Sequence, residues 1–214
     1  MRTTIATLGI FLLATGLAAS SASAAAPQPA KGTLNLDPAH TQISFTLGGS
    51  LHTTEGTFQL KRGTITADPA SGQASGEILI DANSATTNES MRDSTMKDSV
   101  LETQRYPEIS FAPERVAGHE DQDGNFTAKL TGTLRLHGAD HEITLDVNGR
   151  VTGDNLTANT HFVVPYAKWG LHNPSILFLR VNDYVDLTIV ASGHVTWDGG
   201  NAATTASPST APSR

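Results

Sequence analysis

Thr41-Gln42-Ile43-Ser44-Phe45-Thr46-Leu47 carries an apolar residue at every second position from Ile43 onward. Side chains two apart on a β-strand lie on the same face, so this stretch predicts a strand with one apolar face. The same alternation recurs further along the chain and predicts further strands. Its apolar positions are Ile78 and Ile80; Leu130, Leu134 and Leu136; Ile143, Leu145 and Val147; and Val185, Leu187 and Ile189.

One segment interrupts the alternation between residues 42 and 195. Residues 88–104 contain neither glycine nor proline, and Tyr106-Pro107 follows as a stop signal. Thr87 or Asn88 can cap the start of a helix here. The apolar residues that fall on one helical stripe are Met91, Met96, Val100 and Leu101. We therefore expect one helix in a chain that otherwise forms strands, with separate strands at 53–60, 63–67, 76–81 and 177–181.

The strand pattern predicts an all-β, antiparallel fold. A sheet with one apolar face and no helical cover buries that face by closing on itself or by pairing with a second sheet. A closed barrel of about eight strands is wide enough to hold one small apolar ligand. A container for an apolar molecule is therefore the leading hypothesis.

Both ends of the 214-residue chain differ in composition from its centre. Residues 1–24 combine an early arginine, an apolar run and Ala22-Ser23-Ala24, a pattern typical of a secretory signal peptide that is cut before Ala25. The run is too short for a stable membrane span. Residues 34–197 fit one β domain, and residues 199–214 contain no large apolar side chain, which predicts a disordered tail. We expect a periplasmic, exported protein.

The charge and the chemistry of the side chains exclude several functional classes. The net charge is −7, and it becomes −8 once Arg2 leaves with the signal peptide, which disfavours nucleic acid and anionic membrane surfaces as general partners. There is no cysteine and no G-x-S-x-G motif. His137 and His141 flank a predicted turn at Gly138-Ala139-Asp140, but two ligands are fewer than a metal site needs. We expect no catalytic residues, metal or cofactor.

Three features of the sequence allow two interpretations each. Arg92 and Asp93 form either a solvated surface pair or a polar clamp at the barrel mouth. Met91 and Met96 either plug the barrel end or contact a variable apolar guest, because methionine is flexible and polarizable. Trp169 either lines the ligand or locks a corner of the fold. Sequence alone leaves these pairs of alternatives open.

Six stretches carry a resemblance to a known family. They are Leu36-Asp37-Pro38-Ala39-His40-Thr41-Gln42-Ile43-Ser44-Phe45, Gly56-Thr57-Phe58, Ile80-Asp81-Ala82-Asn83-Ser84, Asn88-Glu89-Ser90-Met91-Arg92-Asp93, Tyr106-Pro107-Glu108-Ile109-Ser110-Phe111, and Gly132-Thr133-Leu134-Arg135-Leu136-His137-Gly138 running into Ile143-Thr144-Leu145-Asp146-Val147. With these motifs the chain resembles the YceI-like family of polyisoprenoid-binding, lipocalin-like periplasmic proteins. Thr95 stands where that family usually has a histidine.

The resemblance implies an eight-stranded lipocalin-like barrel with a long apolar tunnel and one helix near its mouth. It also implies an isoprenoid, quinone-like or other long-chain lipid as ligand, and it makes Arg92 and Asp93 candidate mouth residues. Together, the alternation and the resemblance give these candidate ligand-binding residues: Phe45, Phe58, Ile80, Met91, Arg92, Asp93, Met96, Leu101, Phe111, Leu145, Phe162 and Trp169.

The expected function is that of a periplasmic carrier or buffer for such a lipid. Two other classes remain open at this point: an envelope enzyme acting on an amphiphile, with His40, Arg92 or Asp93 at the mouth, and a structural module with a solid barrel. The sequence does not set the oligomeric state, and a homodimer is one option.

Overall fold

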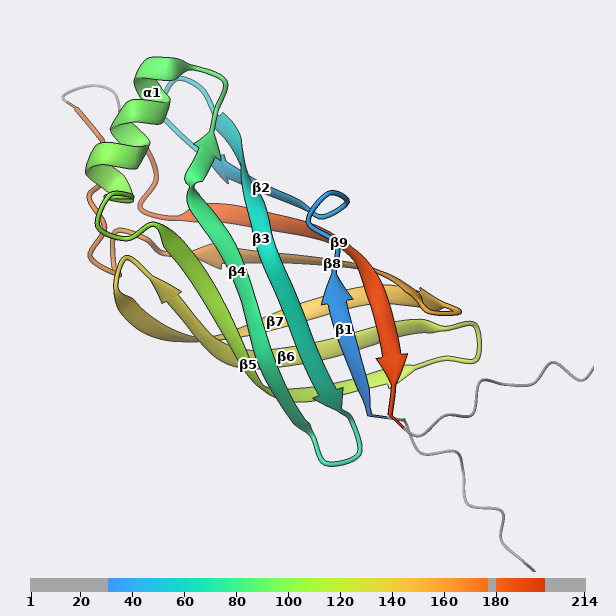
Figure 1. Ribbon diagram of the computed structural model, residues 1–214. Helices are drawn as coiled ribbons and strands as arrows, with labels where there is room; N and C mark the ends of the chain where they lie inside the picture. The colour runs from blue at the N-terminus through green and yellow to red at the C-terminus, as the bar shows by residue number, and fades with distance from the viewer. Residues whose placement is uncertain (1–30, 177–179, 199–214) are drawn as a thin grey trace, which may run out of the picture.

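The computed structural model describes residues 31–176 and 180–198, which form an antiparallel β-barrel (Figure 1). The predicted signal peptide and tail lie outside the described residues. The strands are β1 (Gly32–Leu36), β2 (Gln42–Leu47), β3 (Thr54–Asp68), β4 (Gln73–Thr86), β5 (Glu108–Glu120), β6 (Asn125–Leu136), β7 (Ala139–Thr152), β8 (Asn155–Val164) and β9 (Val185–Trp197). A short helix, α1 (Ser90–Thr95), and a π-helical turn, η1 (Met96–Val100), connect β4 to β5.

The barrel closes because β1 and β2 share one place in the sheet. Each of them pairs with both β3 and β9, so together they act as one interrupted strand and complete an eight-stranded barrel. The interruption falls at Pro38, which has no N–H to donate to a ladder. Asp37 instead accepts hydrogen bonds from the Ala39 N–H and the His40 ring, at 2.8 and 2.6 Å. The predicted all-β, lipocalin-like barrel is confirmed.

The alternation that predicted the first strong strand points into the barrel. Ile43 lies opposite Phe58 on β3 and Ile189 on β9, and Phe45 lies opposite Leu187 on β9. Residues directly opposite each other in a ladder share a face, so these five side chains meet on one side of the sheet. Ile43 and Phe45 are both buried.

A β-bulge explains why two predicted strands, 53–60 and 63–67, are one continuous strand, β3. Leu60 pairs with Ile80, but the next pair on β4 is Arg62 with Leu79, so Lys61 is an extra residue. A bulge of this kind lets two consecutive side chains leave the same face. This local irregularity broke the alternation in the sequence, so the prediction of two separate strands was wrong.

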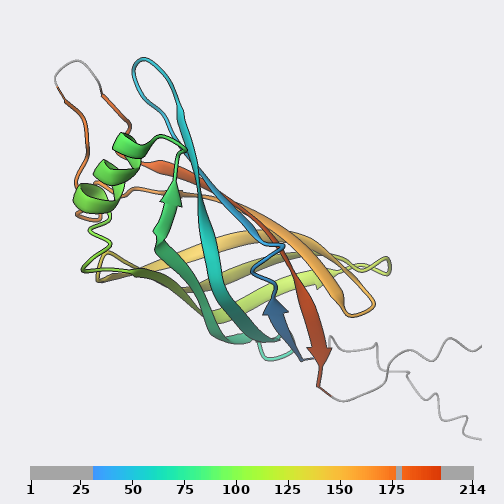
Figure 2. The same cartoon turned by 45° about the horizontal axis from the view of Figure 1, so that its top comes forward.

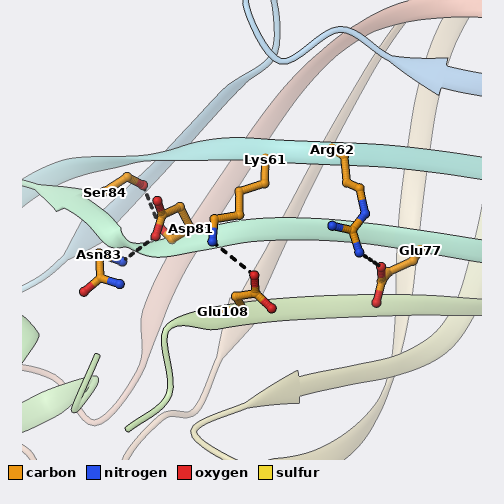
Figure 3. A network of polar contacts seen from close by, with 7 residues as sticks. All are labelled: Lys61, Arg62, Glu77, Asp81, Asn83, Ser84 and Glu108. Carbon is orange, nitrogen blue, oxygen red and sulfur yellow. Dashed lines mark hydrogen bonds and ion pairs between the residues drawn. The ribbon is translucent and has the colours of Figure 1, made fainter. Parts of the chain in front are cut away.

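Figure 3 shows the outward side chains at the bulge. Lys61 reaches Glu108 on β5 at 3.1 Å, and Arg62 reaches Glu77 on β4 at 2.7 Å. These ion pairs are partly solvated, so each stabilises the sheet by less than about 1 kcal/mol. They link the bulged part of β3 to its neighbours β4 and β5.

A second irregularity extends β4 well beyond the predicted strand 76–81. Thr57 pairs with Thr86 and Gln59 with Asp81, so one residue of β3 lies opposite four residues of β4 between these pairs. The Asp81 carboxylate accepts from the Asn83 N–H at 3.0 Å, and the Ser84 hydroxyl donates to the Asp81 carbonyl at 2.6 Å (Figure 3). The bend aims the end of β4 toward the helix.

The helical segment is shorter than the predicted helix at 88–104. Its cap is Glu89, whose carboxylate accepts from the N–H groups of Met91 and Arg92 at 3.2 and 2.7 Å, so the predicted cap at Thr87 or Asn88 is wrong. Asn88 and Glu102 have φ angles of +61° and +45°. These left-handed residues bound the segment, because a helix cannot continue through them.

The turn predicted at Gly138-Ala139-Asp140 lies one residue earlier. His137 and Gly138 have φ angles of +52° and +77°, and Leu136 pairs with Ala139. Two consecutive positive φ angles define a tight two-residue hairpin between antiparallel strands. The register places His141 opposite Leu134 rather than beside the turn.

Gly56 provides a direct test of the inward packing. A Cβ at this position would lie 2.3 Å from Cζ of Phe45 and 2.6 Å from the carbonyl oxygen of Thr86. We expect Gly56→Ala to lower the free energy of unfolding by about 1–3 kcal/mol, as other overpacked cores do. Thr57→Ser, on the exposed face of the same strand, should change it by less than about 0.5 kcal/mol. Urea unfolding of both variants measures the difference, and equal values would contradict the packing described here.

Candidate functional site

The larger cavity of the barrel has a volume of about 520 Å³ and lies at the end that carries α1. This volume lies within the ordinary range for small-molecule sites, about 300–1,000 Å³. Its walls are the inward, apolar side chains of seven strands. These are Ile43, Phe45, Leu47, Phe58, Ile80, Ile109, Leu134, Leu136, Phe162, Val164, Val185, Leu187 and Ile189.

The helical segment forms one side of the opening of this cavity. Its lining residues are Met91, Arg92, Thr95, Met96, Val100 and Leu101. α1 and η1, which the structure describes in full, contain no buried residue. Figures 1 and 2 both place the segment at the end of the barrel opposite the start of β1. The helical cover therefore packs on the barrel through partly buried side chains, Val100 and Leu101, that contact the cluster around Leu136.

Eight of the twelve predicted site residues line the larger cavity. They are Phe45, Phe58, Ile80, Met91, Arg92, Met96, Leu101 and Phe162. The other four predicted residues, Asp93, Phe111, Leu145 and Trp169, lie outside its lining. The prediction missed two kinds of lining residue: inward strand residues such as Ile43, Val164 and Ile189, and loop residues that include Leu51, His52, Ile176 and Arg180. No periodic pattern marks such loop residues, so the sequence carries no signal for them.

Phe111 and Leu145 lie in a filled layer below the cavity. Both are buried in one apolar cluster, where Phe111 pairs with Leu134 and Leu145 pairs with Leu130. Leu134 lines the larger cavity, whereas Leu130 lines a second cavity of about 220 Å³ at the other end of the barrel. Among the described residues, the two cavities share no lining residue. The interior is thus divided, in contrast to the long tunnel that we expected.

Asp93 joins β4 to α1 through three hydrogen bonds. Its carboxylate accepts from the Thr87 hydroxyl at 2.6 Å, the Thr87 N–H at 2.7 Å and the Thr86 hydroxyl at 2.7 Å. These bonds, with the Thr87 hydroxyl first, lower the pKa of Asp93 below its ordinary value. Arg92 Nε donates to the same Thr87 hydroxyl at 2.8 Å. Asp93 therefore fixes the junction, while Arg92 lies at the cavity.

Comparison with known proteins identifies the family. The YceI-like domain matches residues 34–192 of the chain. The chain belongs to the YceI-like family. No curated protein sequence matches it.

Two solved structures are similar to this YceI-like barrel. One is BcnA of Burkholderia cenocepacia, with a TM-score of 0.60 and 19% identity over 73% of this chain and 98% of that one. The other is a polyisoprenoid binding domain from Saccharophagus degradans implicated in plant cell wall breakdown, with a TM-score of 0.58 and 17% identity over 76% and 98% of the two chains. At these identities the similarity establishes a shared fold.

Trp169 locks a corner of this YceI-like barrel. Its ring stacks on His141 with centroids 3.9 Å apart and planes 6° from parallel. The ladder between β7 and β8 runs from Thr152–Asn155 only as far as Val147–Thr160, so the strands separate toward the α1 end. The stack lies beside this gap, since His141 belongs to the part of β7 that pairs with β6 but not with β8. Of its two interpretations, the structure supports the corner lock for Trp169.

His137 serves a different contact from His141. Its Nε2 lies 2.5 Å from the Glu102 carboxylate, and its ring packs on Tyr106 with centroids 4.4 Å apart. This contact ties the end of the helical segment to the β6–β7 hairpin. Within residues 31–176 and 180–198, no group of three or more His, Asp or Glu side chains is arranged to hold a metal ion.

Two loops complete the opening of the cavity. Gly49 and Val181 form an isolated bridge, and the Ser50 N–H donates to the Arg180 carbonyl at 2.8 Å. Of the predicted strand 177–181, residues 177–179 lie outside the described part of the chain. Tyr166 anchors the loop from below, because its hydroxyl donates to the Asn182 carbonyl at 2.7 Å, and burial raises the pKa of Tyr166 to about 12.

In the described ranges no helix has the length and apolar character that a bilayer crossing requires.

The Asp93 junction predicts a pH-dependent stability. The pKa of Asp93 is lower in the folded protein than in the unfolded chain, so its contribution is fully present above the unfolded pKa and is lost as the pH falls through the folded pKa. We expect Asp93→Asn to lower the melting temperature at neutral pH and to have a vanishing effect at strongly acid pH. Thermal unfolding of the parent protein and of Asp93→Asn, measured from neutral to strongly acid pH, tests this prediction.

The control for this experiment is Asp98→Asn, which removes an exposed carboxylate from η1 in the same segment. It should leave the melting temperature nearly constant at every pH. A loss of stability in Asp93→Asn that persists unchanged into acid would contradict the role given to the charged carboxylate.

Proposed function

We propose that this YceI-like protein is a periplasmic carrier or buffer that holds a long-chain isoprenoid, or a similar amphiphilic lipid, in its larger cavity. The observation that carries this proposal is an apolar cavity of about 520 Å³ with an opening at the α1 end. The structurally similar domain from Saccharophagus degradans is described as binding polyisoprenoid, which supports the same class of ligand. The signal-like residues 1–24 support the periplasmic location.

Burial of the hydrocarbon tail would supply most of the affinity. Each buried methylene contributes about 0.8 kcal/mol, so about fifteen of them would contribute about 12 kcal/mol before costs. Association and ordering cost about 4–15 kcal/mol. A single polar contact at the opening adds about 1 kcal/mol. Tail length should therefore affect binding more than the identity of the headgroup does.

The distribution of polar groups gives the bound lipid a direction. The deep wall is apolar, with Leu134 and Phe162 among its residues, whereas His52 and Arg92 lie in the segments that surround the opening. A polar headgroup next to apolar side chains would lose its hydrogen bonds to water. The tail is therefore proposed to point toward the filled layer, with the headgroup at the opening.

The two alternative functions fit the geometry less well. His40, which was a candidate for a reactive group at the mouth, is bonded to Asp37 in the interruption between β1 and β2 and does not line the cavity. Arg92 lines the cavity, but its Nε donates to the Thr87 hydroxyl, and the Asp93 carboxylate accepts from Thr86 and Thr87. The volume of the cavity argues against a solid barrel. A binding role is the conclusion that these placements favour.

Mass spectrometry of the natural ligand is the first test. The protein is purified from the envelope of its native cells, extracted with organic solvent and analysed by mass spectrometry. We expect a long-chain isoprenoid or related lipid in near-stoichiometric amount. An extract without any such lipid, from protein that also fails to bind added geranylgeraniol, would contradict the proposal.

A cavity-filling substitution tests the location of the ligand. Ile80→Trp places a large ring into the cavity, so we expect geranylgeraniol to bind about tenfold or more weakly, as measured by displacement of the apolar dye anilinonaphthalene sulfonate. The matched control is Val190→Trp, which adds the same ring at a position on β9 that is 46% exposed. If both variants bind geranylgeraniol as tightly as the parent protein, the ligand does not occupy this cavity.

A further inference from the structure

Three large apolar side chains are strongly exposed at the opening of the larger cavity. Leu51, Met91 and Ile176 have 74%, 78% and 66% of their surfaces exposed, and all three line the cavity. They come from the β2–β3 loop, the first turn of α1 and the loop that precedes β9. Figures 1 and 2 show these three segments together at one end of the barrel. We call these three residues the apolar rim.

The apolar rim stands out from the rest of the described surface. The other exposed large apolar residues there have 40–50% of their surfaces exposed, and they are Val163, Tyr184, Val190 and Trp197. Single apolar residues on a surface are normal, but a group around one opening marks an interaction site. The position of the group around a lipid-sized cavity indicates that its partner meets the opening itself.

The charges beside the apolar rim favour a partner that carries phosphate. Arg92 and Arg180 line the same opening, and Glu89 is the acidic residue among the lining residues. The Glu89 carboxylate is engaged by the N–H groups at the start of α1. On η1, Lys97 and Asp98 offset each other. The opening is therefore locally cationic on a chain whose net charge is −7.

We propose that the apolar rim docks on the surface of a phospholipid membrane. Leu51, Met91 and Ile176 enter the interface between headgroups and acyl chains, while Arg92 and Arg180 contact lipid phosphates. The acidic remainder of the protein is repelled by an anionic membrane, so the barrel is oriented with its opening toward the bilayer. This assignment rests on the proposed lipid ligand, which could then pass between bilayer and cavity without crossing water.

A second copy of the chain fits the apolar rim less well than a membrane does. In a two-fold symmetric dimer the same patch meets itself. Arg92 and Arg180 of one copy would then approach the same two arginines of the other copy, and like charges in a desolvated contact are unfavourable. A phosphate-bearing surface offers both the apolar environment and the opposite charge.

Vesicle flotation tests the docking directly. The mature chain is mixed with vesicles of phosphatidylethanolamine and phosphatidylglycerol in equal parts and floated through a density gradient. We expect the parent protein to float with the vesicles, and Leu51→Ser and Met91→Ser each to bind about tenfold more weakly. Arg180→Gln should weaken binding mainly at low salt, because salt screens the phosphate contact.

The matched control is Val190→Ser, which removes an exposed apolar side chain from the flank of β9 and should float like the parent protein. Equal losses in Val190→Ser and in the rim variants, or no flotation of the parent protein, would overturn the docking proposal. A third outcome would also overturn it: the parent protein sediments as a dimer, and Leu51→Ser loses the dimer but floats with vesicles like the parent. The apolar rim would then be an interface between two copies of the chain.

A reporter at the apolar rim gives a second, independent readout. Tryptophan emission of Leu51→Trp should shift to the blue when the same vesicles are added, whereas that of Val190→Trp should not. An unshifted Leu51→Trp would overturn the proposal. Dye displacement by geranylgeraniol on the parent protein separates the two hypotheses: protein that binds geranylgeraniol but not vesicles contradicts docking alone, and protein that docks but binds no lipid contradicts the carrier function alone.

Discussion

The pairing of β1 and β2 with both β3 and β9 is the constraint on which the rest of this structure depends. An open sheet would leave unpaired N–H and C=O groups along two edges and an apolar face in water. Closure of the sheet pairs both edges, and it also buries the alternating apolar side chains inside the barrel. The interruption at Pro38 does not open the barrel, because β1 and β2 each find the same two neighbours.

The interior that results from closure is filled unevenly. In the middle, Phe111 and Leu145 meet their neighbours and leave no lining surface. At the α1 end, Phe45 and Phe58 contact each other with centroids 5.4 Å apart, but the opposite walls do not meet. The segment above them presents partly exposed side chains and buries none of its own residues. An empty apolar space of this kind is costly in water, and a hydrocarbon guest would relieve that cost.

Much of the fold could be predicted from the sequence, because a period of two is a direct consequence of strand geometry. The alternation at Ile43 and Phe45 predicted the inward face, and the alternating residues at 130–136 and 143–147 lie in strands β6 and β7 as predicted. The prediction of strand and helix bounds failed where a local backbone irregularity interrupts the two-residue or helical periodicity. The extra residue Lys61 in β3 split one strand into two, and the positive φ of Glu102 shortened the helix.

The site was less predictable than the fold, for a related reason. Alternation shows which side chains face inward, but not whether side chains from the opposite wall touch them. Phe111 and Phe162 therefore could not be distinguished in the sequence, although Phe111 is buried in the filled layer and Phe162 lines the cavity. Trp169 needed the separation of β7 from β8 to explain its stacking on His141. Loop residues such as Leu51 carry no periodic signal, so their place at the opening emerged only in three dimensions.

The central claim is that the α1 end of the barrel is hollow and accepts a hydrocarbon chain. A crystal structure of the protein grown in the presence of geranylgeraniol tests this most directly. We predict continuous elongated density along Phe45, Phe58 and Leu187 that ends above the layer formed by Phe111. Aromatic side chains that close over an empty space, with density for geranylgeraniol absent from the interior, would contradict the account.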